Sequence, residues 1–213
     1  ISFTDPMVND SNNLLSGSLF YSFSGRSSMY YAPLDMITKG GSFRWGRRFK
    51  WPDDYFRGSW SFTAHQRIYE ADNEEQLQLY TGGLNETVGV SITQSISRDS
   101  RDHPEFPTIG SLMAVSSSIS GGPLGGNEDF HKHVLNLEWY TPTVWKFVLM
   151  SSVKIGGIKT LPSGDNERSM VPFNERFIMG GSGMVYGNPL RGYEDNRVGP
   201  VSYTHLTLPT MLW

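Results

Sequence analysis

Hydrophobic and polar residues alternate along most of this chain with a period of two. Trp60 and Phe62, for example, fall on one face of an extended chain, whereas Ser61 and Thr63 fall on the other. Such alternation predicts β-strands that carry one apolar and one polar face. The pattern covers segments 15–23, 43–51, 56–67, 87–96, 113–119, 132–140 and 145–155.

Turn-forming residues gather between these segments. Clusters of Gly, Pro, Asn and Asp stand at 9–13, 52–54, 121–123 and 125–127. Only two short stretches, 31–37 and 74–80, could hold a helical turn. We therefore predict an all-β fold with about eight or nine strands, each of roughly 9–13 residues, in an antiparallel meander.

The predicted strands are long enough to cross a membrane. Strands of soluble proteins have about 5–6 residues, whereas a tilted strand needs about 9–11 residues to span a bilayer. Phe43, Trp51, Trp139 and Trp145 stand near the ends of apolar faces, as the aromatic girdles of membrane β-barrels do. A soluble β-sandwich or lipocalin-like barrel stays open, because alternation does not distinguish lipid from a protein core.

The composition narrows the classes of function. Charged residues make up 18% of the chain, the net charge is -3, and there is no cysteine. A near-neutral chain lacks the clustered Lys and Arg of nucleic-acid-binding proteins, and without cysteine there is no disulfide or thiolate metal site. No apolar run approaches the about 20 residues of a spanning helix. Because the first residues form no signal peptide and lack an initiator methionine, we expect the chain to begin within a longer protein.

Patterns for catalysis and metal binding are weak. His131 and His133 are two residues apart and would share one face of a strand, but no acidic third ligand stands at a recognisable spacing. The serine-rich stretches contain no G-x-S-x-G elbow. We therefore predict no enzymatic activity, no metal and no cofactor.

The Gly-rich segment 172–200 contains one candidate functional side chain. Arg191 precedes Gly192, and an arginine beside a glycine can reach into a lumen and form a bidentate pair with a carboxylate. A solvated surface turn is the alternative.

Four short motifs together resemble one known family. They are F-T-D-P at 3–6, G-R-R-F-K-W-P-D-D-Y-F at 46–56, S-R-D-S-R-D-H-P-E-F-P-T-I-G at 97–110, and R-F-I-M-G-G at 176–181 followed by L-R-G-Y at 190–193. In this order they resemble the BamA family of outer-membrane assembly factors, which has bacterial surface-antigen barrels. Two positions depart from the family pattern: Leu190 replaces the usual Val, and Ile109 stands where Arg is common.

The resemblance implies a partial transmembrane β-barrel. The family barrel has sixteen strands and follows periplasmic POTRA domains, so residues 1–200 would form about half of a barrel. We expect residues 201–213 to be a non-native tail, because their sequence does not follow from what precedes it. The family folds and inserts other barrels into the outer membrane of Gram-negative bacteria through a weak seam between its first and last strands. The implied partners are outer-membrane lipid, client β-barrel proteins and accessory assembly lipoproteins, with no nucleic acid.

The resemblance also suggests which residues carry the function. In the family the signature loop folds into the barrel, so Arg191 would pair there with carboxylates on later strands and Tyr193 would pack against the lumen wall. The candidate loop residues are Leu190, Arg191, Gly192, Tyr193, Glu194 and Asp195. The candidate hairpin residues are Arg98, Asp99, Arg101, Asp102, Pro107 and Gly110.

Several alternatives stay open. Within the superfamily, the chain could belong to a two-partner secretion or TamA-like translocation barrel, or to the barrel domain of a patatin-like protein. Domains that precede the barrel would distinguish these. Outside the superfamily, the alternatives are a passive porin or structural outer-membrane protein and a soluble β-sheet binding module.

Overall fold

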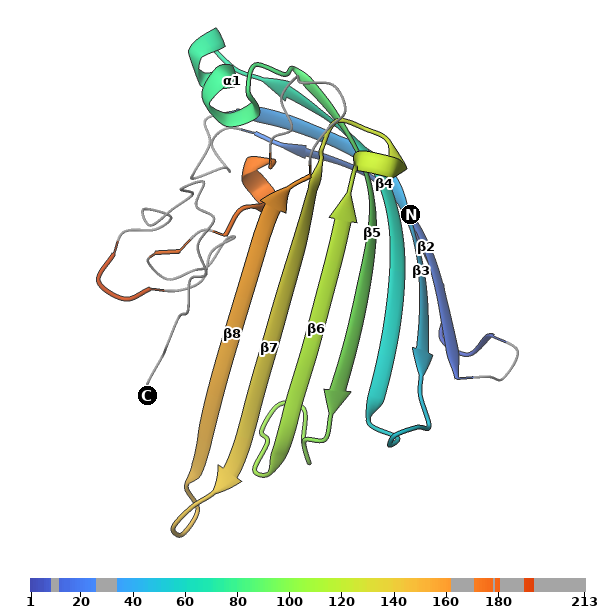
Figure 1. Cartoon of the computed structure of the whole chain (residues 1–213), viewed down its shortest axis with the longest axis vertical. Helices are drawn as coiled ribbons and strands as arrows, with labels where there is room; N and C mark the ends of the chain where they lie inside the picture. Colours follow the sequence, from blue (N-terminus) through green and yellow to red (C-terminus); the bar gives the residue numbers. More distant parts are fainter. Residues whose placement is uncertain (9–11, 26–33, 162–170, 178, 181–189, 194–213) are drawn as a thin grey trace.

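The computed structural model shows a single antiparallel sheet of eight strands in the order β1 to β8 (Figure 1). It describes residues 1–8, 12–25, 34–161, 171–177, 179–180 and 190–193. The strands are β1 (Ser2–Asp5), β2 (Asn13–Ser24), β3 (Asp35–Arg48), β4 (Phe56–Glu70), β5 (Glu86–Asp99), β6 (Gly110–Ser120), β7 (Phe130–Pro142) and β8 (Val148–Thr160). One α-helix, α1 (Glu74–Thr81), and two 3-10 turns, η2 (Gly122–Leu124) and η3 (Phe173–Glu175), accompany them. No helix in the described ranges is both long and apolar enough to cross a bilayer.

The predicted all-β meander is confirmed, since every strand pairs with its neighbour in sequence. Of the two expected helical stretches, 74–80 forms α1, which ends at Gly82 with a φ of 70°. The prediction for 31–37 is wrong for its last three residues, and residues 31–33 lie outside the described ranges. Asp35 begins β3 and pairs with Glu70 on β4, while Met36 also pairs with Ser24 on β2. Neighbours on both sides satisfy the backbone there, so tertiary pairing overrides the local preference.

One face of the sheet exposes hydrophobic side chains. Pairing of β3 to β6 places Phe43, Phe62, Ile92 and Ile119 side by side in a row. Their exposed fractions are 50%, 45%, 42% and 46%. Leu19, Tyr21 and Phe23 on β2 are still more exposed. A continuous apolar belt of this kind fits lipid, because monomeric soluble proteins rarely expose large contiguous apolar patches. We call this the outer face.

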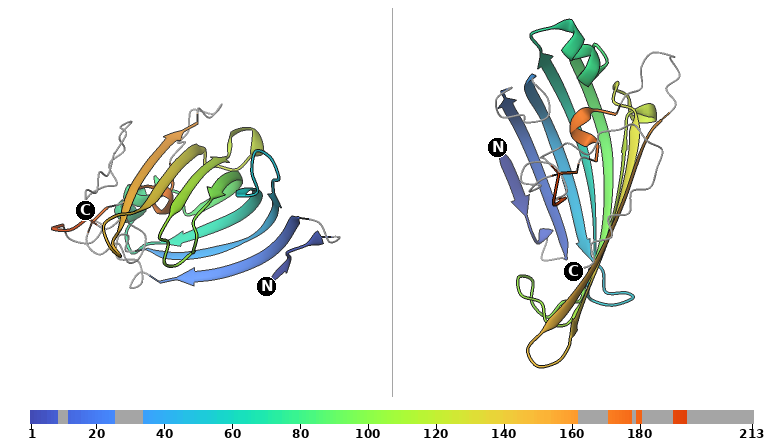
Figure 2. Two further views of the ribbon diagram at one scale, coloured as in Figure 1. Left: turned by 90° about the horizontal axis from the view of Figure 1, so that it is seen from below. Right: turned by 90° about the vertical axis from the view of Figure 1, so that its left-hand side faces the viewer.

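The opposite face is concave and carries small polar side chains. Hydroxyl groups hydrogen-bond directly across neighbouring strands, at 2.8 Å between Ser18 and Ser42 and 2.9 Å from Thr93 to Ser118. Figure 2 shows the curvature of the sheet and places η3 on this inner side. The polar inner face and the apolar outer face together form the wall of a membrane β-barrel, as the alternation predicts.

Aromatic rings gather at the end of the sheet opposite α1, which we call the hairpin end and which comprises loops 49–55, 100–109 and 143–147. Trp45 stacks on Trp60 with ring centroids 4.7 Å apart, and Phe49 meets the edge of Trp60 at 6.4 Å. Trp145 and Phe147 lie in the β7–β8 hairpin, with centroids 6.2 Å apart. Aromatic rings at this end of the strands, tryptophan above all, suit the headgroup region of a bilayer.

The end of the sheet near α1, the α1 end, holds a small apolar core. Leu34, Tyr69 and Phe173 are buried against one another. Phe173 comes from η3, and its ring lies 6.0 Å from that of Tyr69 and 6.2 Å from that of Tyr80. This core holds the chain that follows β8 against the inner side of β4 and α1.

Candidate functional site: an ion cluster on the inner face

A buried ion pair lies on the inner face at the α1 end. Arg67 on β4 donates from Nη1 to both carboxylate oxygens of Glu128, at 2.7 and 2.8 Å. Thr87 on β5 donates to Oε1 of the same carboxylate at 2.7 Å, and Nε2 of His65 lies 3.1 Å from Oε2. The exposed fractions of Arg67 and Glu128 are 7% and 2%, so this pair is shielded from solvent.

The loop between β6 and β7 carries Glu128 into this position. Gly126 pairs with Gly89 on β5, and the amide of Asn127 donates to the carbonyl of Val88 at 2.9 Å. Gly89 has no room for a side chain, because an added Cβ would lie 2.5 Å from the His65 ring and 2.6 Å from Oε2 of Glu128. The glycine therefore permits the close approach of the loop to the sheet.

The surroundings of Glu128 keep it ionised. Burial opposes the negative charge, but the hydrogen bond with His65 and the positive charge of Arg67 outweigh it and lower the pKa of Glu128 to about 2. Removal of Arg67 would leave the buried Glu128 carboxylate without the arginine charge that balances it, which is costly in a medium of low polarity.

Glu175 in η3 extends this pair into a cluster. Its carboxylate lies 3.6 Å from Nη2 of Arg67 and 3.3 Å from Nζ of Lys132 on β7. Lys132 also donates to the backbone carbonyl of Glu175 at 2.9 Å. We call Arg67, Glu128, Lys132 and Glu175 the ion cluster; it joins β4, the β6–β7 loop, β7 and η3.

A cavity of about 400 Å³ adjoins the ion cluster on the inner face. Hydroxyl side chains from β4, β5 and β6 supply much of its lining, and Phe20 and Phe130 contribute aromatic surface. Its polar wall is typical of the water-accessible interior of a membrane barrel.

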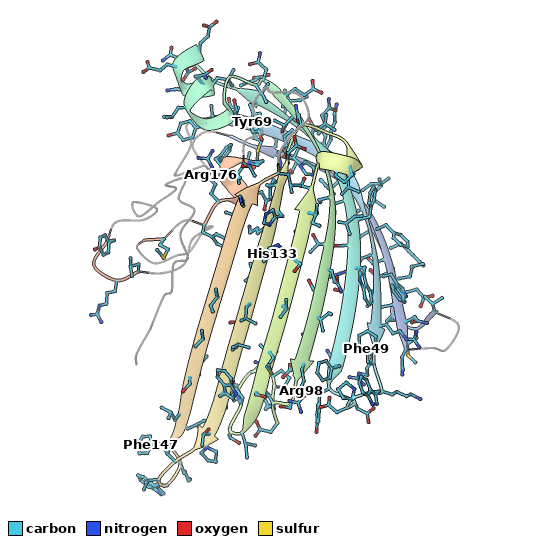
Figure 3. The ribbon with its side chains drawn as sticks, in the orientation of Figure 1. Phe49, Tyr69, Arg98, His133, Phe147 and Arg176 are labelled. Carbon is cyan, nitrogen blue, oxygen red and sulfur yellow. The ribbon has the colours of Figure 1, made fainter. Side chains whose placement is uncertain are left out.

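The hairpin motif predicted from the sequence lies at the other end of the sheet (Figure 3). Nε of Arg98 lies 2.8 Å from Oδ2 of Asp53, and its guanidinium sits 5.4 Å from the centre of the Tyr55 ring. Asp99 and Arg101 form a two-pronged pair, with both N–O distances at 2.9 Å. The motifs at 46–56 and 97–110 are therefore joined in space.

The rest of the hairpin motif shapes the β5–β6 loop. Asp102 accepts hydrogen bonds from the side chain and amide of Thr108, and these bonds lower the pKa of the Asp102 carboxyl. Gly110 has a φ of 113°, and an added Cβ there would lie 2.3 Å from the carbonyl oxygen of Ser100. Pro107 is half-buried in the same loop. These residues have structural contacts, and nothing in their geometry indicates chemistry.

Four residues of the predicted loop motif, Leu190 to Tyr193, are described, and Glu194, Asp195 and the segment 201–213 lie outside the described residues. Residues 190–193 lie on the open side of the curved sheet, away from its inner surface (Figures 1 and 2). Arg191 and Tyr193 are exposed, and Gly192 has a φ of 92°. Within the described part of the chain, the Arg191 side chain has no hydrogen bond or ion pair. The anchoring role of Arg191 and the packing of Tyr193 stay predictions.

Sequence reasoning missed the ion cluster. Arg67 and Lys132 lie on the polar faces of their strands, but Glu128 lies in what reads as an ordinary Gly-rich turn. Glu175 lies just before the motif at 176–181, and this proximity alone could have marked Glu175 as a candidate functional residue.

Metal binding gains no geometric support. The described residues contain no group of three or more His, Cys, Asp or Glu side chains placed to hold a metal ion. Nδ1 of His131 lies 3.1 Å from Nε2 of His133, on a strand face that continues the outer row through Ile119.

The long antiparallel strands, apolar outer face and polar inner face define the wall of an outer-membrane β-barrel. Comparison with known families specifies this class: residues 1–208 match the Omp85 superfamily domain. The chain belongs to the Omp85 superfamily. It is therefore an outer-membrane protein of a Gram-negative bacterium. The alternative of a soluble β-sheet binding module is excluded.

Two of the relatives that the chain matches are named as outer-membrane assembly factors. The chain is 26% identical over 201 residues to the outer membrane protein assembly factor BamA of Nitratidesulfovibrio vulgaris. This alignment covers 93% of the present chain and 23% of the relative. The chain is 32% identical over 107 residues to BamA of Neisseria meningitidis, covering 50% and 12%. A SAM50-like protein of Schizosaccharomyces pombe is 25% identical over 175 residues, covering 78% and 33%. The chain thus spans a third or less of the length of these relatives.

A solved structure supports the fold. The crystal structure of BamA from Haemophilus ducreyi lacking POTRA domains 1-3 superposes with a TM-score of 0.74 at 18% identity. The match covers 93% of this chain and 38% of that one. The predicted partial barrel is therefore confirmed.

Proposed function

We propose that the intact protein carrying this chain folds and inserts other β-barrel proteins into the outer membrane. The observation that carries this proposal is the match of residues 1–208 to the Omp85 superfamily domain, together with relatives named as assembly factors. The role is non-enzymatic. An unpaired strand edge can template an incoming strand through backbone hydrogen bonds, which lowers the cost of carrying unpaired backbone groups into lipid.

The proposed clients are unfolded outer-membrane β-barrel proteins. Outer-membrane lipid contacts the outer face, because the row from Phe43 to Ile119 is apolar and exposed. Accessory assembly lipoproteins are further proposed partners. Loop residues Arg191, Gly192 and Tyr193 contribute by folding into the barrel, where Arg191 pairs with carboxylates that later strands supply.

Depletion of the intact protein from its own cells tests this function. Folded, heat-modifiable forms of several unrelated outer-membrane barrels should fall together, and re-expression should restore them. Normal levels of those barrels, combined with loss of export of a single substrate, would instead support a secretion barrel. Loss of solute permeability alone would support a porin.

The Arg191→Ala variant tests the loop. We expect it to lower client assembly while the protein itself still reaches the membrane. Arg44→Ala, which removes an arginine from the inner face of β3, is the matched control. Full client assembly by the Arg191→Ala variant would show that Arg191 does not anchor the loop.

A further inference from the structure

We propose that Glu175 is a positioning residue: its carboxylate, held between Lys132 and Arg67, fixes segment 171–177 on the inner wall of the barrel, and client assembly depends on that placement. This inference rests on the proposed function. It assigns a role to residues outside the signature loop.

The geometry singles out Glu175 because it contacts two strands at once. Lys132 on β7 binds both its carboxylate and its backbone carbonyl, at 3.3 and 2.9 Å. Arg67 on β4 approaches the other carboxylate oxygen at 3.6 Å. β5 and β6 separate these two strands in the sheet, so a single side chain spans the concave surface between them.

Charge balance supports the same conclusion. The ion cluster contains two cations, Arg67 and Lys132, and two carboxylates, Glu128 and Glu175. Glu128 is already paired with Arg67. If segment 171–177 left the wall, Lys132 would lose its carboxylate partner, and a charged group of this kind is costly to leave unpaired in a partly buried site.

Two aromatic side chains fix the segment on either side of Glu175. Phe173 is 2% exposed within the core at the α1 end. The Phe177 ring lies on β8 at Gly156, where an added Cβ would come within 2.5 Å of it, and Nζ of Lys132 lies 5.2 Å from the centre of that ring. Because Gly156 has no side chain, the Phe177 ring can pack directly on β8. The polar contacts of Glu175 and the apolar contacts of Phe173 and Phe177 therefore hold segment 171–177 in the same position.

A charge exchange between Glu175 and Lys132 tests the proposal in the intact protein. Glu175→Lys alone and Lys132→Glu alone should each lower the rate of client assembly by about tenfold. The double variant should recover about threefold of that loss, because the exchange re-forms the pair between positions 175 and 132 while the new cation then faces Arg67. Glu175→Asp should retain most of the activity. Glu105→Lys, the same charge change on an exposed loop at the hairpin end, should have no effect.

A direct readout of the segment accompanies the rates. Arg176 is half-buried and donates to the carbonyl of Val171 at 3.0 Å, so an arginine-specific protease should not cleave after it in the wild type. Cleavage at Arg176 should appear in both single variants and be slower in the exchange variant than in either of them. Where Glu175→Lys fails to reach the membrane, Glu175→Gln replaces it, with the same expected cleavage.

The outcomes separate this inference from the proposed function. Wild-type assembly and full protection of Arg176 in both single variants would overturn the role of Glu175, as would an exchange variant no better than its parents. If the wild-type protein assembles no clients, the proposed function fails. The protease pattern would still decide whether Glu175 holds the segment.

Discussion

Arg67 and Glu128 form a buried ion pair in which one guanidinium nitrogen contacts both carboxylate oxygens, at 2.7 and 2.8 Å. The two residues are 61 positions apart in sequence, and the contact folds the β6–β7 loop over the inner face of β4 and β5. This pair sets the shape of the α1 end and gives the stability of the barrel a specific dependence on pH.

Stability should fall in acid through Glu128. Its pKa is lowered from about 4.5 to about 2 in the folded state, so its contribution is fully present above pH 4.5 and is lost as the pH falls toward 2. The contribution amounts to about 3 kcal/mol. Urea unfolding of the intact protein in detergent, measured from pH 7 to pH 2, should show this loss in the wild type. Glu128→Gln should be less stable at pH 7 and should lack that part of the acid dependence; an identical pH profile in both proteins would contradict the assignment.

The two faces of β5 should respond in opposite ways to the same substitution. Ile92 points to the outer face near the middle of the strand, and its neighbour Thr93 points to the inner face. Ile92→Arg should destabilise the barrel in lipid by about 2–4 kcal/mol, whereas Thr93→Arg should cost less because water reaches the inner face. Unfolding in phospholipid vesicles measures the difference. Equal costs for both variants would mean that the outer face does not contact lipid.

Arg98 and Asp53 should be energetically coupled. They join the β3–β4 turn to the end of β5 at 2.8 Å, and the side chains are 28% and 32% exposed. A partly exposed pair of this kind should give a coupling energy of about 0.5–1 kcal/mol in a double-mutant cycle with Arg98→Ala and Asp53→Ala. Additive effects of the two substitutions would show that the contact contributes no stability.

Gly110→Ala should destabilise the β5–β6 hairpin. Its φ of 113° is unfavourable for alanine, and the new Cβ would meet the carbonyl oxygen of Ser100 at 2.3 Å. We expect a loss of about 1–3 kcal/mol in the free energy of unfolding. Gly17→Ala on β2 is the control, because a Cβ there has no heavy atom within 4 Å. A larger effect at Gly17 than at Gly110 would contradict the structure.

Much of the fold follows from local pattern. The alternation around Trp60 to Thr63 predicts which side chains share a face, because successive residues of a strand point to opposite sides. The same pattern did not decide whether the apolar face meets lipid or a protein core. The exposed row from Phe43 to Ile119 decides it, because that row depends on the register between four strands.

The ion cluster could not be predicted from the sequence, because it depends on a contact between distant segments of the chain. Glu128 is buried only because Gly126 approaches Gly89 and folds the loop inward, a contact between segments 37 residues apart. The start of β3 at Asp35 was likewise decided by its partners on β2 and β4 rather than by its own residues. The resemblance of four motifs identified the family, but the family motifs did not include Arg67 or Glu128.

The central claim is that the intact protein assembles other outer-membrane barrels. Its most direct test is the folding of a urea-denatured outer-membrane barrel added to liposomes that contain the purified protein, followed by heat-modifiable mobility. The account predicts folding at least about tenfold faster than in empty liposomes or in liposomes that contain a porin. Folding no faster than in the porin liposomes would contradict it.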